Sequence, residues 1–242
     1  MRGTDGSLWL VCFVAAGSAS GCSLFDQVGG GELSFDLPDA RFKIDTGNSR
    51  WWPNPPRGVP QVICRGPAAL VADCCQPSAV IDPPVDCQEY PLSCDDNSMC
   101  ALAFDYDDVA EIDLGTGVLA LHDQRRWVFA QATVDQIKIA VSRTDTKAAP
   151  LPLFAVSLYV APYGVVSART SGAMFLADIP WKMDTSLVDL DPSARLALST
   201  FLTDFNTPFN LILSSRVVVE SGPAPTGTMT IDVYGGRVYA SF

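Results

Sequence analysis

Residues 209–220, Phe-Asn-Leu-Ile-Leu-Ser-Ser-Arg-Val-Val-Val-Glu, carry the clearest structural pattern in this chain of 242 residues. Apolar side chains recur at every second position from Phe209 to Val219, with Ser215 as the one polar member of the series. Successive side chains of a β-strand point to opposite faces, so this spacing is typical of a strand that buries one face. The stretch therefore predicts a long strand and favours a β fold for the chain around it.

The same alternation, with many β-branched and aromatic residues, recurs on both sides of this strand. Further strands are expected at residues 34–37, 41–45, 102–106, 109–114, 127–142, 153–161, 173–179, 229–233 and 238–242. Gly235-Gly236 is expected to form a tight hairpin between the last two of them. Many short strands at this spacing predict a mainly β fold, an antiparallel β-sandwich whose sheets each bury one face against the other.

One short helix is expected among the strands. Asp191 suits the position that caps a helix amino terminus, and Pro192 suits the first helical position. The apolar residues that follow share one side of a helix: Leu198, Phe201, Leu202 and Phe205.

The segment from about residue 51 to residue 100 differs in composition from the rest of the chain. Its many prolines fix φ and remove backbone donors, which excludes long helices and central strands. Six of the eight cysteines of the chain also lie there: Cys64, Cys74, Cys75, Cys87, Cys94 and Cys100. An even set of cysteines in a loop-rich segment of an exported protein predicts three disulfides, with the connectivity left open. A zinc site is the alternative, but the Cys-x-x-Cys pairs typical of one are missing.

The amino-terminal segment has the layout of an export signal. Arg2 precedes an apolar run from Leu8 to Ala16, which is too short to span a bilayer as a helix. The tetrapeptide Ala19-Ser20-Gly21-Cys22 follows, and it resembles the lipobox of bacterial lipoproteins. The resemblance implies that residues 1–21 are removed and that Cys22 is acylated. Ser23 in place of aspartate implies a location at the outer membrane or cell surface.

An ordinary secretory signal with a free Cys22 is the alternative, and it also predicts export. In either case we expect residues 22–33, with three consecutive glycines, to form a flexible tether, and residues 34–242 to form one domain with the insert at about 51–100. The net charge of −11 argues against nucleic acid as a partner, because phosphate binding needs clustered Lys and Arg.

Catalytic and metal-binding motifs are scarce. The sequence lacks Gly-x-Ser-x-Gly, a phosphate-binding glycine loop and His-Glu-x-x-His, and its single histidine, His122, fits a solvated loop. Two acidic groups could offer oxygen ligands to calcium but fit solvated turns better: Asp95, Asp96 and Asn97, and Asp105, Asp107 and Asp108. We therefore expect no enzymatic activity, no catalytic residue, no cofactor and no metal.

Two aromatic features bear on partners. Trp51 and Trp52 precede a proline-rich run, where they could contact a ligand or partner or else cap the core. The last strand, which ends at Phe242, resembles the terminal strand of outer-membrane β-barrel proteins, although a buried closing strand is favoured.

The sequence predicts an exported, lipid-anchored cell-envelope protein that serves as a non-enzymatic structural or binding module. Its expected partners are the membrane, reached through the lipid anchor, and a protein or polysaccharide of the envelope. The alternatives are an envelope polysaccharide hydrolase with carboxylates that converge only in the fold, and an outer-membrane β-barrel component.

Overall fold

The structure is a computed structural model of the chain. It describes residues 32–45, 59, 63, 92–94, 97–118, 129–145, 155–179, 185–222 and 225–241. Several predicted features lie outside the described residues: the signal segment, Cys22, almost all of the tether, Trp51, Trp52, Cys64, Cys74, Cys75, Cys87, Asp95, Asp96, His122 and Phe242.

One layer of the fold is a five-stranded antiparallel sheet in the order β3-β4-β10-β7-β8. Its strands are β3 (Leu92–Cys94), β4 (Cys100–Ile112), β7 (Val156–Pro162), β8 (Met174–Asp178) and β10 (Phe209–Val219). β10 lies at the centre and pairs with β4 along its whole length, from Phe209 opposite Ile112 to Val219 opposite Leu102. The strand predicted at residues 209–220 is therefore confirmed, but its first seven residues are buried on both faces instead of one.

β4 replaces the two strands predicted at residues 102–106 and 109–114. Asp107 and Asp108 continue the ladder opposite Ser214 and Leu213, although their charges suggested a break between two strands. The end of the second predicted strand is instead a one-turn helix, α2 (Leu114–Gly117), which Asp113 caps by accepting a hydrogen bond from the Thr116 amide.

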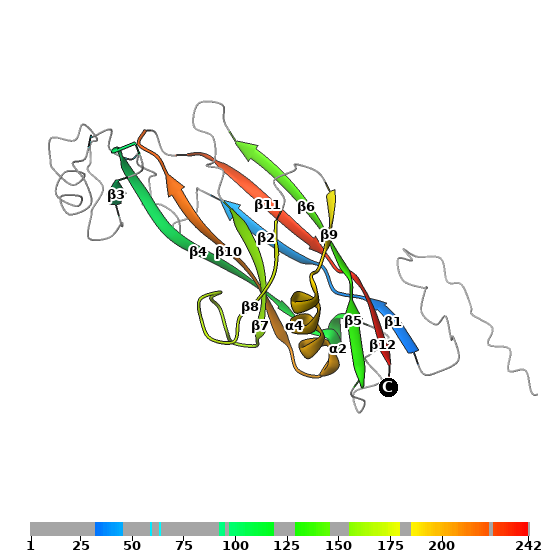
Figure 1. The fold of residues 1–242 in the computed structure, drawn as a ribbon. Helices are drawn as coiled ribbons and strands as arrows, with labels where there is room; N and C mark the ends of the chain where they lie inside the picture. The colour runs from blue at the N-terminus through cyan, green and yellow to red at the C-terminus, as the bar shows by residue number, and fades with distance from the viewer. Residues whose placement is uncertain are drawn as a thin grey trace, which may run out of the picture.

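The other layer consists of two antiparallel sheets, β1-β12-β5 and β2-β11-β6-β9. Their strands are β1 (Glu32–Asp36), β2 (Ala40–Asp45), β5 (Gln131–Val134), β6 (Gln136–Asp145), β9 (Thr185–Asp189), β11 (Gly227–Tyr234) and β12 (Arg237–Ser241). Along the chain β1 leads directly into β2, β5 into β6, and β11 into β12. The two sheets are therefore successive halves of one bent layer (Figure 1).

The hairpin predicted at Gly235-Gly236 is wrong. β11 pairs with β2 and β6, whereas β12 pairs with β1 and β5, so the two glycines join strands that do not pair with each other. A Cβ atom on Gly235 would overlap the carbonyl oxygen of Leu37, and one on Gly236 would overlap that of Gln136. Glycine is needed here because neighbouring backbones approach closely at the bend.

The predicted helix is α4 (Pro192–Thr203), and it begins as expected. The Asp191 carboxylate accepts a hydrogen bond from the Ala194 amide at 2.8 Å, and Pro192 occupies the first turn. Its buried residues are Ala194, Ala197, Leu198 and Leu202. α4 packs against β5 of one layer and β8 of the other, so it closes one side of the space between the layers.

Both layers and α4 contribute to one hydrophobic core. Phe42 and Ile44 of β2, Leu158 of β7 and Ile231 of β11 are essentially inaccessible to solvent and belong to a single cluster. In the described residues the fold is mainly β, every sheet is antiparallel and each sheet is open, as the predicted fold class requires. None of the described helices has both the length and the apolar character needed to cross a bilayer.

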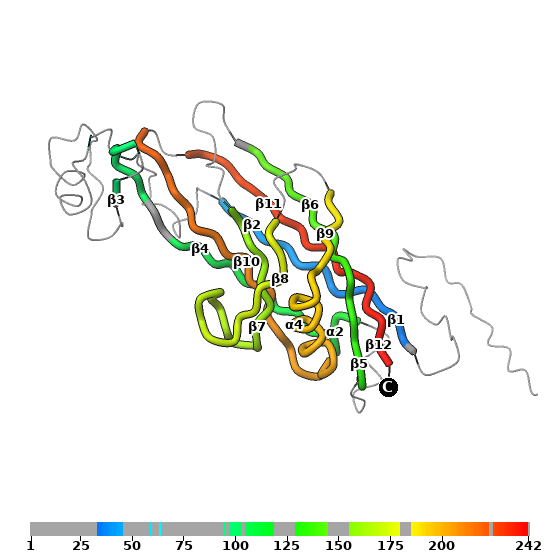
Figure 2. Tube along the Cα trace, in the orientation of Figure 1, coloured from blue at the N-terminus to red at the C-terminus, as the bar shows by residue number. Residues whose placement is uncertain are grey.

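The described body is elongated. Figure 2 shows β1, β12 and β5 gathered at one end and β3 at the other. β12 is the central strand of its sheet, with Val238 and Ala240 buried and Tyr239 exposed, so it is a closing strand with one buried face.

Candidate functional site

The connection between β7 and β8, residues 163–173, is a loop made of hydrogen-bonded turns. The Val165 amide donates to the Pro162 carbonyl at 3.1 Å where the loop begins. Gly164 and Gly172 have φ values of 85° and 101°, in the left-handed region that side chains other than glycine rarely adopt. The sequence of the loop therefore specifies its backbone path.

Charged side chains fasten this loop to the outer face of β4. Arg169 Nη2 lies 2.6 Å from Asp105 Oδ1, and Arg169 Nη1 lies 4.0 Å from Asp107 Oδ2. The Ser167 hydroxyl donates to Asp107 Oδ2 at 2.6 Å. We call these four residues the loop clasp.

The loop clasp corrects one expectation from the sequence. Asp105 and Asp107 lie within a strand and share its outer face, so they are not the solvated turn residues that were predicted. The cation beside them is the Arg169 guanidinium. No group of three or more His, Cys, Asp or Glu side chains suited to a metal comes together in the part of the chain that the structure describes.

Buried polar side chains of β10 support the same region. The Asn210 amide group is buried and donates to the Val165 carbonyl at 2.9 Å, and the buried Ser215 hydroxyl donates to the Ala155 carbonyl at 2.7 Å. Buried polar groups lower the stability of a protein unless they are hydrogen-bonded, so these bonds favour one fixed position of the chain on either side of β7.

The strand register aligns two rows of side chains across the outer face of the five-stranded sheet. The polar row runs across four strands: Asp107, Ser214, Ser157 and Asp178. The apolar row runs parallel to it: Val109, Ile212, Tyr159 and Phe175. Ser157 donates to Asp178 at 2.7 Å, and the rings of Tyr159 and Phe175 meet edge to face with their centroids 5.7 Å apart. Side-chain pairs of both kinds stabilise neighbouring strands.

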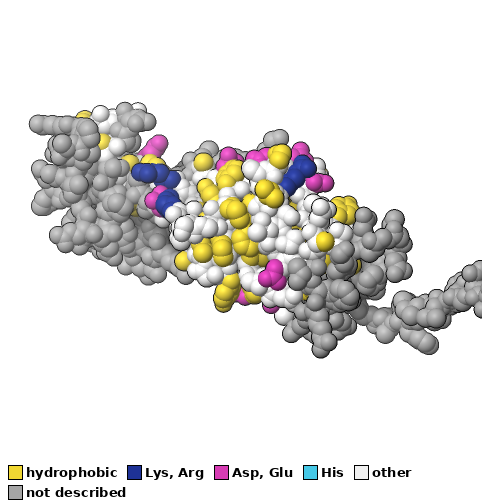
Figure 3. Space-filling view, turned by 60° about the horizontal axis from the view of Figure 1, so that its bottom comes forward, with side chains coloured by type: hydrophobic (Ala, Val, Ile, Leu, Met, Phe, Trp, Pro, Cys, Tyr) yellow, Lys and Arg dark blue, Asp and Glu magenta, His cyan; other side chains and the backbone are white. Residues whose placement is uncertain are grey.

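Large apolar side chains are exposed in the loop and at one end of the apolar row. Tyr163 and Val166 of the loop are 61% and 62% exposed, and Phe175 at the end of the apolar row is 42% exposed. Figure 3 shows hydrophobic side chains gathered in the middle of one face of the molecule. We call Tyr163, Val166 and Phe175 the loop patch. A fixed loop that exposes aromatic and aliphatic side chains can bind a partner with little loss of conformational entropy.

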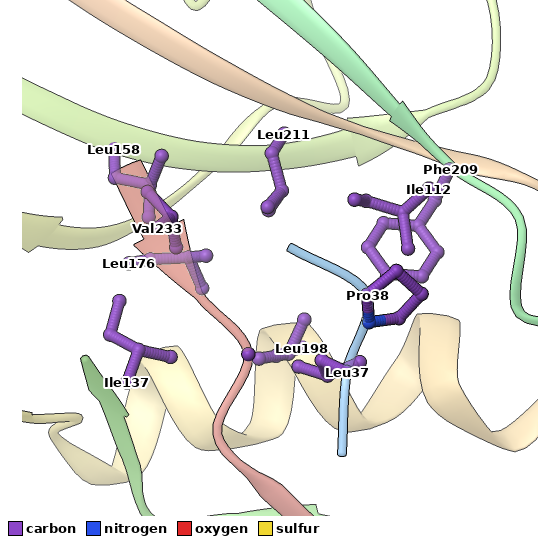
Figure 4. Close-up of a pocket in the computed structure, with 11 residues that line it drawn as sticks. Leu37, Pro38, Ile112, Ile137, Leu158, Leu176, Leu198, Phe209, Leu211 and Val233 are labelled. Carbon is purple, nitrogen blue, oxygen red and sulfur yellow. The ribbon is translucent and has the colours of Figure 1, made fainter. Parts of the chain in front are cut away.

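The space between the layers contains a small apolar cavity of about 20 Å³. Figure 4 shows its lining, which both layers and α4 supply: Leu37, Pro38, Ile112, Ile137, Leu158, Leu176, Leu198, Phe209, Leu211, Val233 and Gly235. Small-molecule pockets usually enclose about 300–1,000 Å³. The cavity has room for about one water molecule but lacks polar partners for it, so we interpret it as a packing gap.

The described residues of the predicted insert attach to one end of the body. Val59 and Gly222 exchange two backbone hydrogen bonds, of 2.8 and 2.9 Å, and Ile63 forms a bridge with Met99. Cys94 and Cys100 lie directly opposite each other where β3 pairs with β4.

The loop clasp and the loop patch were not among the sites predicted from the sequence. Ser167 lies 60 positions from Asp107, so no local motif joins them. The one available signal was the i, i+2 spacing of Asp105 and Asp107, which puts two carboxylates on the same face of a strand.

No protein-family model and no curated protein matches this chain. Among solved structures, the chain is similar to one titled "TURNIP YELLOW MOSAIC VIRUS", with 13% identity over 58% of this chain and 79% of that chain and a TM-score of 0.24. A second, titled "Structure of Turnip Yellow Mosaic Virus at 100 K", has 15% identity over 58% of this chain and 91% of that chain, with a TM-score of 0.22. Similarities this low carry no argument about the function of the chain.

Proposed function

We propose that this chain is an exported cell-envelope protein, anchored by an acylated Cys22 at the outer membrane or cell surface, that serves as a non-enzymatic binding module. The lipobox-like tetrapeptide at residues 19–22 supports the anchor. β1 begins at Glu32, so only residues 22–31 separate the proposed lipid from a strand of the core. At full extension those residues span about 35 Å, which keeps the body near the membrane.

The observation that supports a binding role best is the loop between β7 and β8. Its path is set by glycines with positive φ and by the loop clasp, and beside exposed polar residues it exposes two large apolar side chains, Tyr163 and Val166. Soluble surfaces rarely expose large apolar groups together without a binding role. The partner we propose is a protein or polysaccharide of the envelope.

We propose further that the body is a β-sandwich and that the six cysteines from Cys64 to Cys100 form three disulfides. Cys94 and Cys100 face each other in the strand register, which supports a disulfide between these two. Disulfides persist in exported proteins, so three bridges agree with the proposed location.

Metabolic labelling with a palmitate analogue tests the anchor. We expect the wild-type protein to be labelled and to fractionate with membranes, and the Cys22→Ala variant to lose both properties. Labelling that persists in Cys22→Ala would contradict acylation at this residue.

Photo-crosslinking in living cells tests the binding surface. A photoreactive amino acid in place of Val166 should give discrete crosslinked products, because the partner lies against the loop patch. Leu187 of β9 and Leu196 of α4 are the matched controls, since they are 69% and 71% exposed and lie on other elements. Equal crosslinking from all three positions would contradict a binding role for the loop.

A further inference from the structure

The tether and the predicted insert join the body at opposite ends. Glu32, where the tether enters β1, pairs with Ser241, the last residue of β12. Val59 pairs with Gly222, just before β11, and Cys100 begins β4 close to the end of β10. Figure 1 shows β1 and β3 at the two extremes of the ribbon. We call these the tether end and the insert end.

β11 and β12 together connect the two ends. They run in sequence from Gly227 to Ser241, with one bend at Gly235 and Gly236. At a rise of about 3.3 Å per residue, this run covers about 45 Å. Residues 22–31 reach at most about 35 Å even when fully extended, so the body is longer than the segment that would join it to the lipid.

We infer that the anchored protein stands with its tether end toward the lipid and displays its insert end outward, about 45 Å farther from the membrane. The inference rests on the proposed acylation of Cys22. The net charge of −11 favours this orientation, because an acidic body is repelled by an anionic lipid surface when it lies along that surface.

The outward end is also where two apolar side chains meet solvent. Ile63 is 73% exposed and Val218, near the end of β10, is 40% exposed. In an upright orientation, a partner that approaches from outside would first meet these two side chains and the paired ends of β3 and β4 at Cys94 and Cys100.

Energy transfer to a labelled membrane tests the orientation. The full acylated protein is reconstituted in vesicles of phosphatidylethanolamine and phosphatidylglycerol that contain an acceptor-labelled lipid. A donor is attached by non-thiol chemistry to an unnatural amino acid in place of either Ile63 or Tyr239, which is 56% exposed on β12. Gln131 is exposed and pairs with Ser241, so it serves as a second site at the tether end if the label at position 239 prevents folding.

We expect strong transfer from position 239 or 131 and weak transfer from position 63, consistent with a difference in height of about 45 Å. Equal or reversed transfer from an acylated, vesicle-bound protein would overturn the orientation and leave the anchor intact. A wild-type protein without an acyl group would overturn both the anchor and the orientation. The Cys22→Ala variant supplies the baseline, since it should give no transfer from any position.

Discussion

Replacing Gly235 by alanine should destabilise the fold far more than adding one methyl group to an open surface would. The new Cβ would overlap the carbonyl oxygen of Leu37, and both atoms belong to chain segments fixed by neighbouring strands. The segments would have to separate, which endangers the 3.1 Å hydrogen bond from the Leu37 amide to the Gly236 carbonyl. Overpacking costs about 1–3 kcal/mol and a lost hydrogen bond about 1 kcal/mol, which together give about 2–4 kcal/mol.

The matched control is Gly164→Ala. Gly164 has a φ of 85°, but no atom lies within 4 Å of the position of its Cβ, so alanine there should cost only the backbone strain of about 1–2 kcal/mol. Thermal and urea unfolding, followed by circular dichroism without added oxidant or reductant, measure both variants. In a domain of this size 1 kcal/mol lowers Tm by about 2–4 °C, so Gly235→Ala should lower it by roughly 5–15 °C. If Gly235→Ala costs no more than Gly164→Ala, the close approach at the bend is refuted.

Three further predictions concern the core, the loop clasp and α4. Leu198→Ala should lower the free energy of unfolding by about 3–5 kcal/mol, because the deletion enlarges an existing apolar cavity; a cost below 1 kcal/mol in urea unfolding would contradict this packing. Arg169→Ala should change global unfolding by less than about 1 kcal/mol, since its ion pairs are half exposed, yet speed amide hydrogen exchange across residues 163–173; unchanged exchange would show that the loop clasp does not hold the loop. Hydrogen bonds from the Ser193 hydroxyl and the Ala194 amide lower the pKa of Asp191 in the folded protein. Asp191 therefore adds fully to the free energy of unfolding at pH values above its pKa in the unfolded chain, and this contribution is lost as the pH falls through its lower pKa in the folded protein. Asp191→Asn should remove this part of the pH dependence of the free energy of unfolding. Identical pH profiles of unfolding for the wild-type and variant proteins would contradict a lowered pKa of Asp191.

Local patterns were enough to predict the central strand and the longer helix. The strand at residues 209–220 and the helix capped by Asp191 follow from side-chain spacing and capping chemistry alone. β9 was missed because Leu187 points to solvent and is 69% exposed, so its five residues lack the apolar alternation of a half-buried strand. β3 has only three residues, which is too short to show any period.

Contacts between residues far apart in the sequence explain the other features that the sequence did not predict. Gly235-Gly236 looks like a hairpin when only the flanking residues are considered, and the approach of Leu37 and Gln136 from distant strands makes it a bend instead. The loop clasp depends in the same way on β4 and the β7–β8 loop, which the register of β10 brings side by side. Such contacts depend on how the strands are paired, so the spacing of residues along one segment does not predict them.

Intact-mass spectrometry of the mature protein, extracted from membranes with its thiols protected, tests the central claim most directly. We expect a chain that begins at Cys22, carries an acyl modification and has the six cysteines from Cys64 to Cys100 joined as three disulfides. A chain that retains residues 1–21, with no acyl group and with all of these thiols reduced, would contradict the proposed export, the anchor and the orientation inferred from it.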